Sequence, residues 1–136
     1  MAKRFYIATR KDRESLANAI SQKFEAHGWR RTFVWTAQDG SSSADQYRIV
    51  AQSELNAIRD ADVLIVLLPG GYGTHVEIGA ALVLGKPVII HSPDHETLNT
   101  PYACVFHYHP GVKLIVSDSV DPDMILMAVS NSDKIG

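Results

Sequence analysis

The sequence predicts a single α/β domain over residues 1–130, with a doubly wound, five-stranded parallel sheet. Short apolar runs alternate with longer amphipathic segments along the 136 residues, which implies parallel strands joined by right-handed helical crossovers. The run at 63–68 is apolar throughout, as expected of a strand covered on both faces. Five strands suit the flavodoxin-like or Rossmann-like order 2-1-3-4-5. We therefore expect the third strand to be central, with Leu64 and Val66 among the most buried residues.

The first part of the chain predicts two strands and one helix. Residues 5–9 (Phe-Tyr-Ile-Ala-Thr) read as the first strand, and the segment 13–26 has apolar residues at helical spacing. Gly28 follows that helix, where a left-handed cap is common. Residues 31–36 are predicted to form the second strand. The polar, serine-rich segment 38–44 is expected to be a flexible loop and the best candidate for a lid.

The middle of the chain predicts a helix–strand–helix–strand sequence. The second helix is expected at 45–60, and the third strand at 63–68. A third helix is expected at 74–84, closed by Gly85. The fourth strand follows at 87–91.

The last part of the chain is less regular. Residues 92–111 are rich in His, Pro and Tyr, with at most one expected helical turn. The fifth strand is predicted at 113–117 and the last helix at 121–129, with Pro122 in its first turn. Residues 131–136 are expected to form a frayed tail.

Composition bounds the class of protein. The net charge is −2 and no basic tract is present, which argues against nucleic acid as a partner. The single cysteine, Cys104, cannot form an internal disulfide, and this fits a reducing cytosol and a cytoplasmic location. No apolar stretch reaches membrane-spanning length, and the apolar part of the start is too short for a signal peptide. A membrane partner is therefore not expected.

A glycine-rich turn between the third strand and the third helix is the strongest functional signal. Glycine has no Cβ, so a ligand can approach the backbone closely. The N-terminus of a helix also favours anions, because its N–H groups have no internal partners. The candidate binding residues of this turn are Gly70, Gly71, Gly73 and Thr74, and one carboxylate, Glu77, follows just inside the helix.

The predicted topology places a second turn beside the first. In doubly wound sheets, ligands bind outside the carboxyl ends of the strands, at the switch point between strands one and three. Thr9 and Arg10 end the first strand at this rim. Arg10 could bind a substrate phosphate through a bidentate contact, or it could be a solvated turn arginine.

Three segments of the sequence resemble a known family. Ser-Glu-Leu-Asn-Ala-Ile-Arg-Asp-Ala-Asp-Val at 53–63, Gly-Thr-His-Val-Glu-Ile-Gly-Ala-Ala at 73–81 and Gly-Lys-Pro-Val-Ile at 85–89 are similar to the nucleoside 2-deoxyribosyltransferases. That family includes the 2′-deoxynucleoside 5′-phosphate N-hydrolases. The opening Phe-Tyr-Ile-Ala at 5–8 also resembles the family's first strand. The likeness covers about two thirds of the chain and implies cleavage or transfer at an N-glycosidic bond, without an organic cofactor.

The resemblance implies roles for three residues. The catalytic nucleophile falls on Glu77 and the active-site tyrosine on Tyr6. The acidic residue that positions the base or the sugar falls on Glu54, where the family usually has Asp. Family members commonly complete each active site with a neighbouring subunit, so a homodimer or larger homo-oligomer is expected. The aromatic and His-rich segment 99–110 is the part expected to reach across.

The glycine turn departs from this family and resembles another. Pro-Gly-Gly-Tyr-Gly-Thr at 69–74 is similar to the turn of the lysine-decarboxylase-like phosphoribohydrolases, which also cleave an N-glycosidic bond. The substrate therefore stays open between nucleosides and nucleotides, and the reaction between hydrolysis and transfer.

Each assignment has a structural alternative. Glu77 could serve only to complement the helix dipole, Glu54 could be a solvated helix residue, and Tyr6 could be a core aromatic with a satisfied hydroxyl. The whole pocket could instead be a non-catalytic nucleotide-binding or sensing module, in which Glu77 would anchor a ribose.

Metal and nucleotide cofactors are not expected. His107 and His109 alternate at strand spacing, with His91 and His95 nearby in sequence. However, no Cys pair or His-Glu-x-x-His helix accompanies them. Cys104 lies among apolar residues and is expected to be packed rather than nucleophilic. The sequence also lacks a Walker lysine motif and a Gly-x-Gly-x-x-Gly opening the first helix.

Overall fold

A computed structural model describes residues 3–34, 43–99 and 101–131. Its five strands form one parallel sheet in the order β2-β1-β3-β4-β5. The strands are β1 (Arg4–Ala8), β2 (Arg30–Arg31), β3 (Val63–Leu67), β4 (Val88–Ser92) and β5 (Val112–Val116). This is the predicted class and order, with β3 in the centre. Leu64 and Val66 are almost fully buried, as expected.

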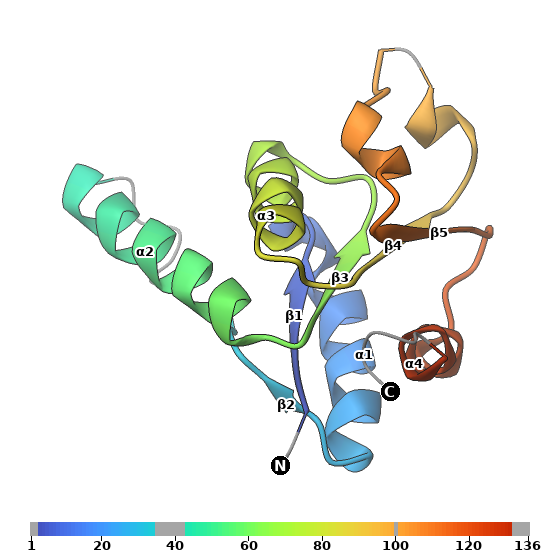
Figure 1. Cartoon of the computed structure of the whole chain (residues 1–136), viewed down its shortest axis with the longest axis horizontal. Coiled ribbons are helices and arrows are strands. Elements are labelled where there is room, and N and C mark those ends of the chain that lie inside the picture. The colour runs from blue at the N-terminus through green and yellow to red at the C-terminus, as the bar shows by residue number, and fades with distance from the viewer. Residues whose placement is uncertain (1–2, 35–42, 100, 132–136) are drawn as a thin grey trace.

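Helices cover both faces of the sheet (Figure 1). They are α1 (Glu14–Ala26), α2 (Ala44–Asp60), α3 (Tyr72–Val83) and α4 (Pro122–Ser130). Helices α1 and α4 pack on one face against side chains such as Phe5 and Ile65. Helices α2 and α3 pack on the other face, against side chains such as Tyr6 and Leu64. Successive residues of a strand point to opposite faces, so each strand contributes to two cores.

Local capping explains where the helices begin and end. The Ser43 side chain accepts from the Gln46 N–H at the start of α2, and Asp121 accepts from the Asp123 N–H at the start of α4. Gly28 and Gly85 follow α1 and α3 with φ of 87° and 72°, the left-handed conformation that favours glycine. Both were predicted as helix stops.

The differences from the predicted elements are small and lie at their edges. The regular part of the second strand is only Arg30–Arg31, at the edge of the sheet, whereas the sequence predicted 31–36. Residues 35–42 are outside the described part, so the predicted lid at 38–44 is tested only by Ser43 and Ala44, which begin α2. The tail residues 132–136 are also outside it.

The irregular segment after β4 contains two short 3-10 helices rather than one turn. They are η3 (Glu96–Leu98) and η4 (Val105–Tyr108). A third, η1 (Lys11–Arg13), precedes α1. The strand spacing of His107 and His109 in the sequence does not correspond to a strand, because His107 lies in the 3-10 helix η4. No helix in the described ranges has both the length and the apolar character needed to cross a bilayer.

Candidate active site

Glu77 is a buried carboxylate held by a tyrosine from a different element. It lies in the second turn of α3, only 7% exposed. The Tyr6 hydroxyl donates a hydrogen bond to Glu77 Oε2. Strands β1 and β3 are neighbours, and α3 follows β3, so Tyr6 faces the first half of α3. The position of Glu77 also argues against a role limited to the helix dipole, which acts within the first turn.

The environment of Glu77 favours its neutral form. The pKa of Glu77 is raised to about 8, chiefly by burial; the hydrogen bond from Tyr6 lowers this pKa, and the nearby Glu54 carboxylate raises it. Burial also raises the pKa of Tyr6, with contributions from Glu77 and Glu54. Tyr6 therefore stays protonated and acts as a donor. A carboxyl with a strongly perturbed pKa in a cleft is a common mark of a functional site.

Glu77 and Glu54 line one cleft of about 410 Å³. Its walls come from the turn after β1, from α2 and from the first turns of α3. The lining residues are Thr9, Arg10, Lys11, Tyr47, Val50, Glu54, Gly71, Gly73, Thr74 and Glu77. The cleft lies at the carboxyl ends of β1 and β3, the predicted switch point, and its volume is in the range of small-molecule sites.

The glycine turn is shaped by a contact between Gly70 and Thr74. A Cβ on Gly70 would come within 2.5 Å of Thr74 Cγ2, so this position needs glycine for close approach. The Thr74 hydroxyl in turn accepts from the Gly71 N–H at 3.3 Å. A Cβ on Gly71 or Gly73 would meet nothing within 4 Å. These two glycines leave open space in the cleft wall.

Positive φ does not explain the glycines of this turn. Among the described residues, only Gly28 and Gly85 have positive φ, and Gly71 is extended, with φ −102° and ψ −164°. A left-handed backbone is therefore not the reason for glycine at position 71.

The rim formed after β1 carries two cations. Arg10 is paired with Asp12, its Nη2 lying 3.1 Å from Asp12 Oδ2, and it is partly exposed. Lys11 follows it at the same rim. Thr9 is buried, and its hydroxyl donates to the Leu67 carbonyl at 2.7 Å. Thr9 thus ties β1 to β3, and Arg10 and Lys11 are the cationic side chains that line the cleft.

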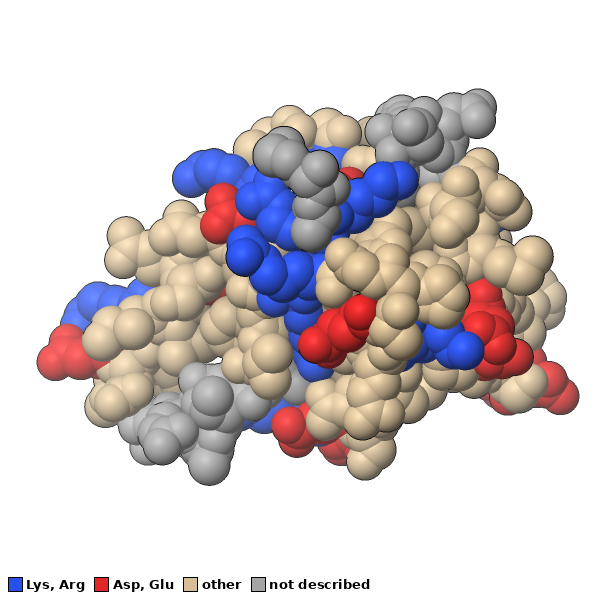
Figure 2. Space-filling model, turned by 90° about the horizontal axis from the view of Figure 1, so that it is seen from below, with Lys and Arg blue, Asp and Glu red and all other residues tan. Residues whose placement is uncertain are grey.

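Other Lys and Arg side chains gather away from the cleft. Figure 2 shows a band of them on the side where the first strands begin. Arg4 and Arg30 are the first residues of β1 and β2 and lie opposite each other in the sheet. Asp62 partly offsets their charge, because its Oδ2 lies 3.8 Å from Arg4 Nε and also accepts from the Arg4 backbone N–H at 2.8 Å. An anion in the cleft would therefore depend on Arg10, Lys11 and the N–H groups of the glycine turn.

The structure brings most of the predicted site residues together. Glu77, Glu54, Thr9, Arg10, Gly71, Gly73 and Thr74 all line the cleft. Tyr6 lies behind Glu77 and contacts it, and Gly70 packs against Thr74. The sequence did not point to Lys11, Tyr47 and Val50. Of these three residues, only Lys11 could have been inferred from the sequence, because it is a cation that directly follows Arg10.

The histidines near the end of β4 are separated in space. His91 Nε2 lies 2.9 Å from Ser117 Oγ, and His109 Nδ1 accepts from the Gly111 N–H. His107 is instead close to His75 and Cys104. Burial, followed by the charge of His75, lowers the pKa of His107. This group of three residues is the one that could hold a metal ion in the described ranges, and the sequence did not predict it.

Comparison with known proteins identifies the family. Residues 5–128 match the family model of the nucleoside 2-deoxyribosyltransferases. The chain belongs to the nucleoside 2-deoxyribosyltransferase family. Membership indicates an enzyme that cleaves or transfers at the N-glycosidic bond of nucleosides or nucleotides. No curated protein matches the chain.

Solved structures of similar fold agree with this family. The CMP N-glycosidase BcmB of Clostridium botulinum is 23% identical with a TM-score of 0.64, over 94% of this chain and 98% of that one. The 2-deoxyribosyltransferase of Leishmania mexicana is 20% identical with a TM-score of 0.63, over 96% and 99%. The 2-deoxyribosyltransferase of Bacillus psychrosaccharolyticus is 20% identical with a TM-score of 0.61, over 96% and 92%. At these identities the likeness shows the fold.

Proposed function

We propose that this protein breaks the N-glycosidic bond of a nucleoside or nucleoside 5′-monophosphate, preferentially a 2′-deoxy one, with Glu77 as nucleophile. One observation carries the proposal. Glu77 is a buried carboxylate in the wall of a ligand-sized cleft, and it is oriented by the Tyr6 hydroxyl. A neutral core tyrosine with no other purpose would not need a buried acid as its partner, because a backbone carbonyl satisfies a hydroxyl at lower cost.

The chemistry needs a carboxylate at the anomeric carbon and a proton for the leaving base. Breaking the bond builds positive charge on the anomeric carbon, which a carboxylate can stabilise or attack. In the proposed step, a Glu77 oxygen bonds to that carbon while the carbon–nitrogen bond breaks. The electron pair stays on the base nitrogen, which takes a proton from water, while the Glu54 carboxylate positions the base or the sugar. Water or a second base then displaces Glu77, giving hydrolysis or transfer respectively.

The rim supports a substrate with a 5′-phosphate. Arg10 and Lys11 are the cations that line the cleft, and Arg10 can exchange its contact with Asp12 for a phosphate because both side chains are partly exposed. The similar CMP N-glycosidase acts on a nucleotide by its description, and the two deoxyribosyltransferases are described by transfer of deoxyribose. The test therefore includes nucleosides and their 5′-monophosphates as substrates, and water and a second base as acceptors.

A panel assay tests the proposed reaction. The protein is incubated with ribo- and deoxynucleosides and their 5′-monophosphates, each with and without a free acceptor base. Release of free base alone establishes a hydrolase, and an exchanged nucleoside establishes a transferase. Absence of turnover on every member would contradict the proposal.

A binding module is the second candidate, and one observation favours it. With its pKa raised to about 8, Glu77 is mostly protonated at neutral pH. A neutral carboxyl group donates a hydrogen bond to a ribose hydroxyl better than it attacks a carbon. Calorimetry separates the two candidates, because tight nucleotide binding without turnover supports the sensor.

We also propose that the protein is a homodimer or larger homo-oligomer. Three large apolar side chains of α3, Tyr72, Val76 and Val83, are at least 63% exposed, and their spacing places them on one side of the helix. The segment predicted to reach across, 99–110, also carries exposed apolar residues, namely Tyr102, Val105, Phe106 and Tyr108. Large exposed apolar surface commonly marks a protein–protein interface.

A further inference from the structure

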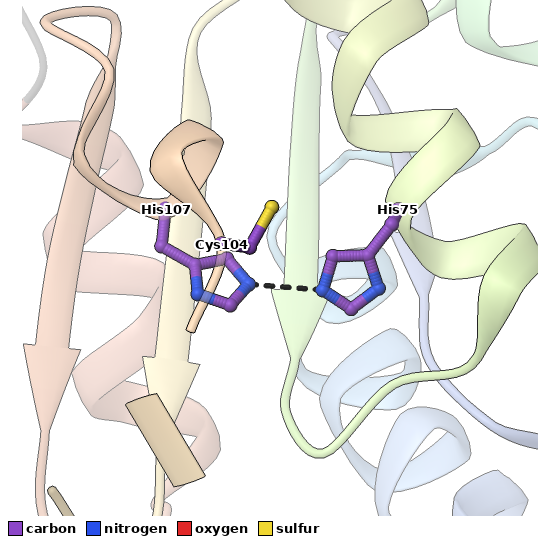
Figure 3. A group of neighbouring side chains, drawn as sticks. All are labelled: His75, Cys104 and His107. Carbon is purple, nitrogen blue, oxygen red and sulfur yellow. Dashed lines mark hydrogen bonds between the residues drawn. The ribbon is translucent and has the colours of Figure 1, made fainter. Parts of the chain in front are cut away.

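Three potential metal ligands converge where η4 meets the first turn of α3. His75 comes from α3, and Cys104 and His107 come from the segment after β4. One ligand atom of each lies within 4.8 Å of the others. Figure 3 shows the two imidazole rings directed toward each other, with the Cys104 side chain beside them. His75 and Cys104 are half-buried, and His107 is almost fully buried.

Local geometry explains why two ligands from η4 point the same way. Cys104 immediately precedes η4, and its carbonyl accepts from the His107 N–H at 3.1 Å. In a 3-10 turn, side chains three residues apart are eclipsed. The Cys104 thiol and the His107 ring therefore lie on one side of the turn, facing α3.

The hydrogen bonds of His75 leave a lone pair directed at His107. His75 Nδ1 lies 2.9 Å from the Gly71 carbonyl oxygen, which can only accept. Nδ1 of a neutral His75 ring therefore carries the proton, and Nε2 is a bare lone pair. Metal-binding histidines commonly have this arrangement, in which a hydrogen bond from the other ring nitrogen fixes the tautomer.

Either neutral tautomer of His107 leaves one ring nitrogen of the pair unsatisfied. His75 Nε2 and His107 Nε2 are 2.9 Å apart, and His107 Nδ1 is buried with no hydrogen-bond partner among the described residues. If His107 Nε2 donates to His75, its Nδ1 is a buried acceptor without a donor. If Nδ1 holds the proton, two lone pairs face each other, and a cation between them removes that repulsion.

We propose that His75, Cys104 and His107 bind a zinc ion that clips η4 to the start of α3. Thiolate and imidazole together are the donors that zinc prefers. Tetrahedral zinc with Zn–N near 2.0–2.1 Å needs a separation of about 3.3 Å between two ligand nitrogens. The ring nitrogens, at 2.9 Å, must therefore separate by a few tenths of an ångström. The fourth position is taken by water.

The clip acts on the glycine turn and not on the chemistry of the cleft. Metal on His75 Nε2 makes its Nδ1–H a stronger donor to Gly71, which lines the cleft. The ion thus holds together the segment 104–107, the first turn of α3 and the glycine turn. This role is independent of the proposed reaction, so the two can fail separately.

Metal titration of the full chain tests the site. We expect one equivalent of Zn²⁺ to bind, and Co²⁺ to give a thiolate-to-metal charge-transfer band with the strong visible absorption of tetrahedral cobalt. In Cys104→Ser the charge-transfer band disappears. In His75→Ala, as in Cys104→Ser, zinc affinity falls by at least about tenfold. The matched control is His95→Ala, which removes an exposed histidine outside the group. The zinc affinity of this variant should equal that of the unchanged protein.

Two further readouts need neither activity nor a variant of the buried His107. Zn²⁺ should raise the melting temperature in proportion to the logarithm of its concentration, and it should protect Cys104 from alkylation. Both effects should vanish in His75→Ala. Circular dichroism of this variant excludes misfolding as the cause. Absence of zinc binding by the unchanged chain would overturn the proposal, as would equal zinc affinity in Cys104→Ser and His75→Ala.

Discussion

The Tyr6 hydroxyl, on the first strand, donates a hydrogen bond to the Glu77 carboxylate, 71 residues later on α3. Tyr6 is itself almost fully buried and packs near Phe33, with ring centroids 6.1 Å apart. The tyrosine is therefore fixed by the core, and it holds the carboxylate in one orientation in the cleft wall. Such support by a rigid neighbour is what a nucleophile needs for productive geometry.

The first prediction is a pH profile governed by Glu77. A nucleophilic carboxyl must be ionised, and burial raises the pKa of Glu77 to about 8. Below that pH most of the free enzyme is in the protonated, inactive form, so kcat/KM should rise about tenfold per pH unit and level off above about pH 8. Steady-state kinetics from pH 5 to 10 measure this inflection.

Two substitutions should move that inflection in opposite directions. Glu54→Gln removes the negative charge that raises the pKa of Glu77, so the inflection should shift to lower pH. Tyr6→Phe removes the hydrogen bond that lowers this pKa, so the inflection should shift to higher pH. The position of the inflection, not the size of the rate, is the readout. Shifts of the same sign, or none, would show that another group governs the profile.

The second prediction concerns Arg10 and a 5′-phosphate. Hydrogen bonds to charged groups contribute roughly 1.5–3 kcal/mol, so Arg10→Ala should lower kcat/KM for a nucleoside 5′-monophosphate by about 10- to 150-fold. Activity on the matching nucleoside should change little. Asp12→Asn is the control, because it releases Arg10 from its ion pair and should preserve the preference for the monophosphate. Equal losses on both substrates would remove the phosphate role.

The third prediction separates two glycines of the same turn. Gly70→Ala would place Cβ within 2.5 Å of the Thr74 side chain, and such overpacking costs about 1–3 kcal/mol. In Gly71→Ala the new Cβ meets nothing within 4 Å, so stability should be nearly unchanged. Denaturant unfolding of the two variants measures the difference. Equal stability of the two variants would mean that Thr74 can move aside freely.

The fourth prediction concerns assembly. Val76 on α3 and Met127 on α4 are both 63% exposed, but they lie on helices that cover opposite faces of the sheet. Val76→Asp should dissociate the oligomer at micromolar concentration, whereas Met127→Asp should leave it intact. Sedimentation velocity measures both. A monomer in the unchanged protein, or equal effects of the two variants, would count against α3 as the interface.

The fold could be predicted from the sequence because each element carries a local signal. The apolar run ending in Leu68 can only be a covered strand or a short buried helix, and the glycines after it exclude a long helix. Gly28 and Gly85 end their helices with positive φ, as their positions predicted. The second strand is shorter than predicted. It lies at the edge of the sheet and has one neighbouring strand, so its apolar pattern alone does not determine its length.

The site could be predicted only in part, because contacts between distant residues depend on packing. The topology placed Arg10 and the glycine turn on one rim, but it gave no reason for a bond between Tyr6 and Glu77. The grouping of His75 with Cys104 and His107 was missed for the same reason. The histidines close to His107 in sequence are not its neighbours in space, whereas His75, 32 residues away, contacts it.

The central claim, that Glu77 is the nucleophile, is tested most directly by turnover in Glu77→Gln. Glutamine keeps the shape and can still accept from Tyr6, and it resembles the protonated acid that a pKa of about 8 implies at neutral pH. Folding and ligand binding should therefore persist, as checked by thermal unfolding and calorimetry. Turnover should fall by at least about a thousandfold, because the lost charge acts mainly in the transition state. Near-normal turnover in a folded, ligand-binding Glu77→Gln would contradict the account.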